Sequence, residues 1–258
     1  MNFDSRYKKA SNRIVRRRKL RHLYSISLKV GIPLVIIFCM FYLVNADFLQ
    51  INNIVVRGNS SVESDSIVEV SKNYISQKKY FLFPKSNYLT LSKSELQDLL
   101  LNAFPRIENV NISKKINRTL EIDIKERVGQ YIWCSVSDDC YLMSSNGLVF
   151  TKADSLDALS KIVFKGVIDG DPVMKYFTDE ESMKRYLNIV SRFKDKSIEV
   201  TEMKVEYSNK LSLTTGVGLI ILNPEEDMDR QATNILLLIE DNSQKGNKNF
   251  EYIDARLS

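Results

Sequence analysis

The chain has 258 residues, 44% of them hydrophobic, and a formal net charge of +5. Its single histidine, His22, lies in the N-terminal tail, so the rest of the chain has no imidazole for a Ser-His-Asp triad, a Cys-His pair or a His-ligated metal. It also has no G-x-G-x-x-G or P-loop pattern, which excludes the common nucleotide-binding motifs. We therefore expect no cofactor, no metal ion and no small-molecule substrate.

An abrupt change from positive charge to apolar sequence marks the N-terminal region. Residues 1–29 hold ten of the 37 Lys and Arg residues and one of the 32 acidic residues, giving the tail a charge of +9 and the remainder −4. Residues 30–46 carry no charge, and 17 such residues are at the short end of a membrane-spanning helix. Because positive flanks stay in the cytoplasm, this predicts a cytoplasmic basic tail (1–29) on anionic lipid, one transmembrane helix (30–46) and the bulk of the chain outside the cytoplasm.

Two other interpretations of the N-terminal region remain open. The residues Val44-Asn45-Ala46 have the small side chains of a signal-peptide cleavage site, although 29 residues is long for the basic region of a signal peptide. The basic cluster at 16–19 would also suit nucleic acid, but positive charge beside a membrane segment is expected without it. We therefore expect a retained anchor and no nucleic-acid partner.

Cys134 and Cys140 are the only cysteines after the apolar run, which itself contains Cys39. They flank a Ser-Asp-Asp turn between two short apolar stretches, and this spacing suits a disulfide across a hairpin. Closing so short a loop is worth about 2 kcal/mol. A pair of buried thiols is the alternative, whereas a structural zinc site would need two further ligands.

The region at 48–126 predicts a small α+β module with the order β-α-α-β-β. Gly58-Asn59 ends a β-rich run, and Ser64 is suited to cap a helix that begins at Asp65. A capping box at Ser92-Lys93-Ser94-Glu95 begins a second helix, which Pro105 ends. The expected elements are a strand at 48–56, helices from 65 and from 92, and a hairpin at 110–112 and 120–124 with one buried face.

The region at 127–258 predicts a strand-rich mixed α/β domain. Asn146-Gly147 is typical of a tight hairpin turn. A capping box at Thr178-Asp179-Glu180-Glu181 and the pair Asn223-Pro224 each begin an amphipathic helix. The expected strands lie at 131–133, 141–143, 148–150, 162–164, 200–207, 211–215, 217–222 and 250–257. The predicted fold class is therefore α+β, with a single-pass transmembrane helix followed by these two folded regions.

Carboxylates are the remaining candidates for catalysis. Asp169 and Asp171, or the run Glu225, Glu226 and Asp227, would be needed as a pair for sugar chemistry. The first pair has the composition of a turn, and the second run follows Pro224 at an expected helix start. We predict no catalytic residue, and a membrane-anchored or secreted envelope enzyme that acts through carboxylates stays the alternative.

The order of these parts resembles a known family. The strand FLQINNIVVRGN after the apolar run, the phrase AFPRIENVNISKKINRTLEIDIKER and the hairpin CYLMSSNGLVF are together similar to the FtsQ/DivIB bacterial division proteins. The resemblance implies a POTRA domain at 48–126 and the family's β domain at 127–258. Another POTRA-type assembly factor is a weaker alternative, since no ten-residue strands with a lipid-facing side follow residue 127.

The resemblance implies a non-catalytic scaffold at the division septum, which binds FtsB/DivIC- and FtsL-type partners and links them to septal peptidoglycan synthesis. A final strand at the edge of a sheet can pair with a partner segment by strand addition. The residues of that edge are Tyr252, Ile253, Asp254, Ala255 and Arg256, of which Asp254 and Arg256 match the family's D-x-R pattern. Proline at Ile253 is expected to remove a donor from this edge. The alternative role for Asp254 and Arg256 is an exposed ion pair.

Overall fold

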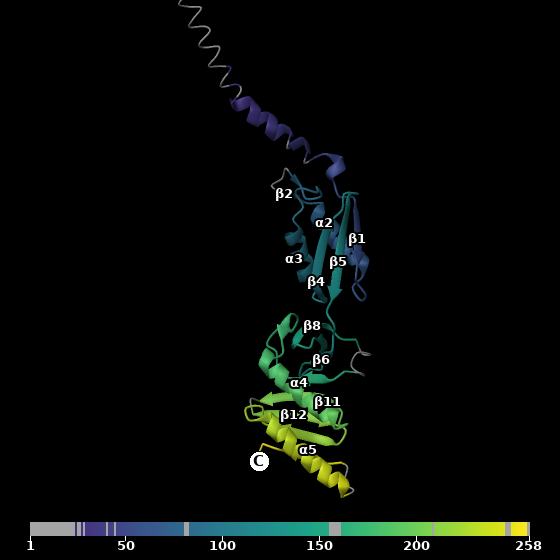
Figure 1. Ribbon diagram of the computed structural model, residues 1–258, viewed down its shortest axis with the longest axis vertical. Coiled ribbons are helices and arrows are strands. Elements are labelled where there is room, and N and C mark those ends of the chain that lie inside the picture. The colour runs from purple at the N-terminus through teal and green to yellow at the C-terminus, as the bar shows by residue number, and fades with distance from the viewer. Residues whose placement is uncertain are drawn as a thin grey trace, which may run out of the picture. The chain divides into compact units, whose positions relative to one another are not determined.

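The computed structural model describes residues 24, 27, 29–39, 41–43, 45–79, 83–154, 161–207, 209–245 and 249–256 (Figure 1). The predicted basic tail lies almost wholly outside them, as does Leu257 at the other end. Contacts divide the chain into two compact units, of which one holds 1–59, 63–100 and 110–123 and the other 60–62, 101–109 and 124–258. The predicted domain boundary between 126 and 127 stays a prediction.

Residues 29–39 and 41–43 are helical. Within the described ranges, however, no helix is both long enough and apolar enough to cross a membrane. The transmembrane helix predicted at 30–46 as part of the fold class is therefore wrong. The uncharged run that suggested it has only 17 residues, fewer than the roughly 20 that a spanning helix requires.

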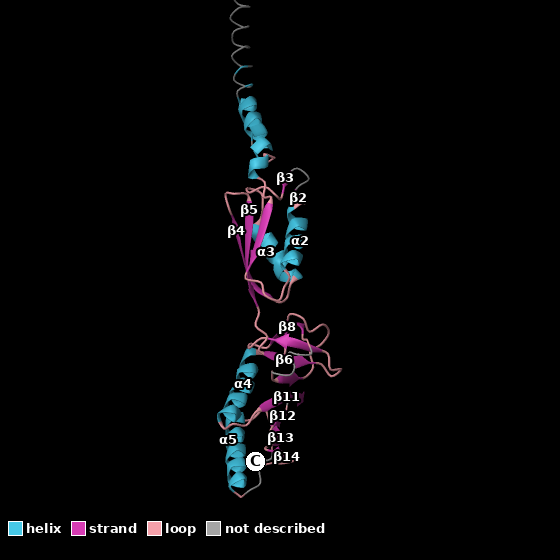
Figure 2. Cartoon of the chain, turned by 90° about the vertical axis from the view of Figure 1, so that its right-hand side faces the viewer, coloured by secondary structure: helices cyan, strands magenta, loops and turns pink. Residues whose placement is uncertain are grey.

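The N-terminal α/β module is a three-stranded sheet in the order β1-β5-β4, and α2 and α3 lie on one face of it (Figures 1 and 2). The predicted order β-α-α-β-β is confirmed, with a short extra hairpin. The elements are η1 (Asp47–Leu49), β1 (Asn53–Arg57), α2 (Ser64–Ile75), β2 (Lys78–Lys79), β3 (Phe83–Pro84), α3 (Lys93–Ala103), β4 (Ile107–Lys114) and β5 (Thr119–Glu126).

Residues 119–122 of β5 are buried on both faces, whereas the sequence predicted one buried face. The reason is its central position, because β1 pairs with it in parallel and β4 in the order β1-β5-β4 lies on its other side. Leu120 and Ile122 are fully buried on one face. On the opposite face the Glu121 carboxylate forms ion pairs with Arg57 at 2.6 Å and with Lys115 at 2.8 Å. These cations satisfy a buried charge and lower the pKa of the Glu121 carboxyl, chiefly through the hydrogen bond from Lys115.

The second unit is built on a nine-stranded mixed sheet in the order β10-β8-β7-β6-β9-β11-β12-β13-β14. Figure 2 shows α4 and α5, one above the other, on the same side of strands β11 to β14. The strands are β6 (Tyr131–Cys134), β7 (Cys140–Met143), β8 (Leu148–Lys152), β9 (Val163–Lys165), β10 (Lys175–Tyr176), β11 (Val200–Tyr207), β12 (Lys210–Thr215), β13 (Gly218–Leu222) and β14 (Tyr252–Asp254). The helices are α4 (Glu180–Asp195) and α5 (Met228–Gln244).

Both helices of this unit begin later than the sequence suggested. Asp179, and not Thr178, caps α4 by accepting a hydrogen bond from the Ser182 N–H at 2.9 Å. Asp227 caps α5 in the same way through the Arg230 N–H at 3.0 Å. The segment that begins with Asn223 is a turn instead, because the Asn223 side chain accepts the Glu225 N–H at 3.0 Å.

The core of the second unit lies between the sheet and these helices. Met203, Leu213, Ile220 and Ile253 occupy matching positions on the four neighbouring strands β11 to β14, and all four contribute to this core. Fully buried Phe193 lies in the same cluster. The sheet face that carries these side chains is therefore closed, and the opposite face of β11 to β14 is not covered by α4 or α5.

Candidate partner-binding site

Strand β14 is the last strand of the nine-stranded sheet. It pairs in parallel with β13, with Leu219 opposite Tyr252 and Ile221 opposite Asp254. Among the described residues no further strand pairs with its other side. An edge of this kind presents backbone donors and acceptors that another extended segment can use.

The register decides which backbone groups are available on that edge. The Leu219 N–H donates to the Glu251 carbonyl, and the Ala255 N–H donates to the Ile221 carbonyl at 2.9 Å. Because successive residues of a strand direct their backbone groups to opposite sides, the groups of Ile253 also face β13. The N–H and C=O groups of Tyr252 and Asp254 therefore face away from the sheet.

The core holds β14 in place. Ala255 is buried and the half-buried Ile253 packs against the same core. Before the strand, the Phe250 N–H donates to the Val217 carbonyl at 2.8 Å. Gly218 allows this approach, since a Cβ there would lie 2.2 Å from the Phe250 carbonyl oxygen. The edge is therefore a fixed template, which lowers the entropic cost of pairing with it.

Apolar side chains lie beside the free edge on the uncovered sheet face. Tyr252 is 61% exposed and its partner in the register, Leu219, is 37% exposed. These two neighbours give an incoming strand an apolar contact in addition to backbone hydrogen bonds. Leu219 was not among the residues that the sequence singled out. It lies in the apolar run of β13 next to Gly218, on the strand beside the edge strand.

Charged residues occupy the other end of this face. The Asp254 carboxylate and the Arg256 guanidinium form a two-point ion pair, with Arg256 Nε 3.0 Å from Oδ1 and Nη2 2.7 Å from Oδ2. The hydrogen bond from Arg256 is the main cause that lowers the pKa of Asp254. On β11 and β12, Glu206 pairs with Lys204 at 2.8 Å and with Lys210. These ion pairs lower the pKa of the Glu206 carboxyl. Because acidic and basic side chains pair with each other here, the net charge of this face is close to zero.

The five residues predicted for partner binding are thus on or next to one strand, but they do not share a face. Tyr252, Asp254 and Arg256 alternate onto the uncovered face, and Ile253 and Ala255 turn into the core. The expectation that proline at Ile253 removes an edge donor is therefore corrected, because the Ile253 N–H faces β13.

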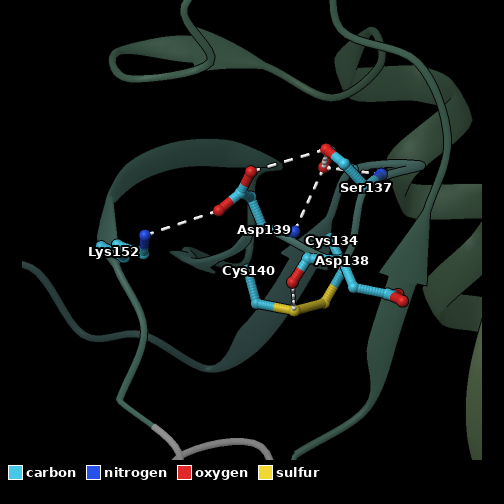
Figure 3. Close-up of polar contacts among 7 residues, drawn as sticks. Cys134, Ser137, Asp138, Asp139, Cys140 and Lys152 are labelled. Atoms are coloured by element: carbon cyan, nitrogen blue, oxygen red, sulfur yellow. Dashed lines mark hydrogen bonds and ion pairs between the residues drawn. A yellow bond between two sulfur atoms is a disulfide. The ribbon is translucent and has the colours of Figure 1, made fainter.

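Cys134 and Cys140 form a disulfide that joins β6 and β7 across their hairpin. Figure 3 shows the bond below the loop that it closes. In that loop the Ser135 hydroxyl accepts the N–H groups of Ser137 and Asp139, each at 3.2 Å, and Asp138 has a φ of 59°. The Asp139 carboxylate meets Lys152 of β8 at 3.5 Å. Covalent and polar contacts together fix the loop.

Three of the five candidate catalytic carboxylates have local structural roles. Asp171 accepts the Val173 N–H at 3.0 Å, Glu226 accepts from the Asn223 side chain at 3.1 Å, and Asp227 caps α5. Nor does the described part of the chain bring together three or more side chains that could hold a metal ion. The described residues at the β14 edge can pair with another strand and contact its side chains. They include no nucleophile with an adjacent base.

Comparisons with known proteins find similarity to a domain family and to cell division proteins. The FtsQ-type POTRA domain family matches residues 49–127. The cell division protein DivIB of Clostridium acetobutylicum is 24% identical over 200 residues, which cover 74% of each protein. DivIB proteins of Clostridium botulinum strains Hall and Loch Maree are each 27% identical over 119 residues, 46% of this chain and 42% of theirs.

The family match covers the N-terminal α/β module, and the longest alignment with a DivIB protein is longer than these 79 matched positions. Residues 49–127 therefore match the FtsQ-type POTRA domain family, and the chain is similar to DivIB cell division proteins.

Proposed function

We propose that this chain is a scaffold of the bacterial division complex that binds a partner by strand addition at β14. The observation that carries the proposal is the free edge of the nine-stranded sheet, on which the backbone groups of Tyr252 and Asp254 face outward. The exposed Tyr252 and Leu219 beside that edge support it. A partner segment gains affinity from the backbone hydrogen bonds and specificity from the side-chain contacts.

The proposed partners are division proteins of the FtsB/DivIC and FtsL types, which place the scaffold at the septum and link it to peptidoglycan synthesis. The DivIB relatives support a role in cell division for this chain. We also propose that the second unit works outside the cytoplasm, which the disulfide between Cys134 and Cys140 supports because such bonds persist in oxidising compartments. Anionic lipid at the basic tail 1–29 is part of the same proposal.

Two proline variants test strand addition. Tyr252→Pro removes the outward-facing N–H of Tyr252. An edge strand tolerates proline at such a position, because this N–H makes no bond within the sheet. We expect the full-length variant to fold and to lose the division proteins that the wild type recovers from solubilised membranes of its source cell, identified by mass spectrometry. Tyr252→Val is the matched control, since it removes the ring and keeps the N–H.

The outcomes separate backbone pairing from side-chain contact. Capture by Tyr252→Val but not by Tyr252→Pro supports strand addition. Capture of the partners by a folded Tyr252→Pro variant as strong as by the wild type would contradict strand addition. Equal loss of capture in both variants would assign the binding to the Tyr252 ring. Ile253→Pro removes a bond to β13 and is expected to lower the stability of β14 itself, which far-ultraviolet circular dichroism and thermal unfolding detect.

A further inference from the structure

Three segments of the N-terminal α/β module meet at the end of the sheet where β1 and β5 begin. They are 47–50, 84–93 and the hairpin tip 114–118. The Tyr88 N–H donates to the Leu49 carbonyl at 2.7 Å, and the Arg118 Nε donates to the Gln50 carbonyl at 3.0 Å. The Asn52 N–H donates to the Arg118 carbonyl at 3.0 Å. These bonds make the three segments one surface, here named the hairpin end.

Each of the three segments of the hairpin end exposes one large apolar side chain. Ile116 is 98% exposed, and Phe48 and Leu89 are each 64% exposed. Single apolar side chains on a surface are ordinary, but these three stand on segments that are hydrogen-bonded to each other. Ile116 stands at the tip of a turn that Arg118 completes with a φ of 64°, a position where polar residues are usual.

The same surface is strongly basic. The three segments contain Lys85, Lys93, Lys114, Lys115 and Arg118 but a single acidic residue, Asp47. Lys115 remains about half exposed although Glu121 pairs with it. Lys114 is held just below the surface, where its Nζ donates to the carbonyls of Tyr88 at 2.7 Å and Leu91 at 2.8 Å. Lys85 pairs with Glu95 at 3.7 Å and its side chain is only 16% exposed, so the cations that the three segments expose wholly or in part are Lys93, Lys115 and Arg118.

We propose that the hairpin end rests on the headgroup layer of an anionic lipid bilayer. Protruding apolar side chains flanked by Lys and Arg are the combination that such an interface accepts, because the apolar groups enter the acyl boundary and the cations meet phosphate. Exposed apolar side chains continue into the preceding segment of the chain, and this favours lipid over a soluble partner. Residues 29–39 and 41–43, which directly precede this surface, also expose large apolar side chains, among them Ile37 and Phe38.

A fluorescent reporter on Ile116 tests this contact in the full-length protein. The exposed free thiol is removed by Cys39→Ser, and Ile116→Cys is labelled with an environment-sensitive dye without reductant, which leaves the disulfide intact. The protein is then mixed with phosphatidylcholine vesicles with or without phosphatidylglycerol. The control reporter is at Val167→Cys in the second unit, an apolar residue that is 73% exposed.

With anionic vesicles we expect the emission of the dye at 116 to shift to shorter wavelength and its quenching by aqueous iodide to fall, while the dye at 167 stays unchanged. High salt is expected to reverse the shift, since the attraction is screened. Equal behaviour at 116 and 167 in both kinds of vesicle overturns the proposal, even if the tail carries the protein onto the vesicles. A shift at 116 with soluble polyphosphate and none with vesicles overturns it in favour of an anionic polymer.

Discussion

The Asp254 carboxylate accepts the backbone N–H of Arg256 at 3.1 Å as well as its guanidinium. The N–H of Arg256 would otherwise follow those of Tyr252 and Asp254 along the outer edge of β14. Because the carboxylate occupies it, the edge offers outward donors only at Tyr252 and Asp254 within the described strand. A partner strand that pairs here is therefore expected to be short and to depend on contacts with the neighbouring face.

Gly218 controls the position of β14. Its φ of 136° favours glycine, and a Cβ would lie 2.2 Å from the Phe250 carbonyl oxygen. We expect Gly218→Ala to lower the free energy of unfolding by about 1–3 kcal/mol and to reduce partner capture, because the start of β14 must move.

Gly216→Ala is the matched control for that change. Apart from its chain neighbours, no described heavy atom lies within 4 Å of a Cβ built at Gly216. Chemical denaturation of the two variants beside the wild type measures the difference. Equal stability and equal capture in both variants would show that the close approach of Gly218 to Phe250 does not position the edge.

Glu126 holds the loop that follows β1. Its carboxylate accepts the N–H groups of Ser60 at 2.6 Å, Ser61 at 2.9 Å and Val62 at 3.0 Å, and Arg106 lies 3.4 Å away. Burial raises the pKa of Glu126, but these hydrogen bonds outweigh it and lower the pKa to about 2. We expect Glu126→Gln to lower the free energy of unfolding at neutral pH by about 2 kcal/mol.

The pH dependence of that difference follows from the lowered pKa. An unfolded glutamate has a pKa of about 4.3, so the stabilisation by Glu126 is complete above this value and is lost as the pH falls toward 2. Urea unfolding of wild type and Glu126→Gln between neutral and acidic pH is expected to converge. A difference that stays constant down to about pH 3 would contradict the assigned role of the carboxylate.

The disulfide predicts a simple thiol pattern. In the oxidised full-length protein only Cys39 is expected to react with iodoacetamide, and Cys134 and Cys140 are expected to react only after reduction. Replacing both with serine removes a loop closure worth about 2 kcal/mol and should speed amide exchange in the loop 135–139. Alkylation of Cys134 or Cys140 without reductant would show that the bond does not form.

Local sequence signals predicted the elements well and their pairing poorly. The first bond of the predicted capping box at Ser92 is present, since the Ser92 hydroxyl accepts the Glu95 N–H at 3.3 Å. The parallel pairing of β1 with β5 joins Asn53 to Thr119, and no local pattern announces a contact so distant in sequence. The double burial of β5, and with it the buried Glu121, follows from that pairing and was missed for the same reason.

The backbone groups of the candidate site could not be predicted from local sequence for the same reason. Alternation along β14 places Tyr252 and Asp254 on one face, but it does not say which backbone groups are free. That depends on the register with β13, in which Ile220 lies opposite Ile253. For this reason the sequence predicted that this segment is an edge strand but selected for proline a residue whose N–H faces β13.

Residue-resolved amide hydrogen exchange of the full-length protein, with and without its captured partner, tests strand addition most directly. Strand addition predicts that the amides of Tyr252 and Asp254 exchange fast in the free protein and become protected on binding, while the Ile253 amide is protected in both states. A bound partner that leaves the Tyr252 and Asp254 amides as fast as before would contradict strand addition at β14.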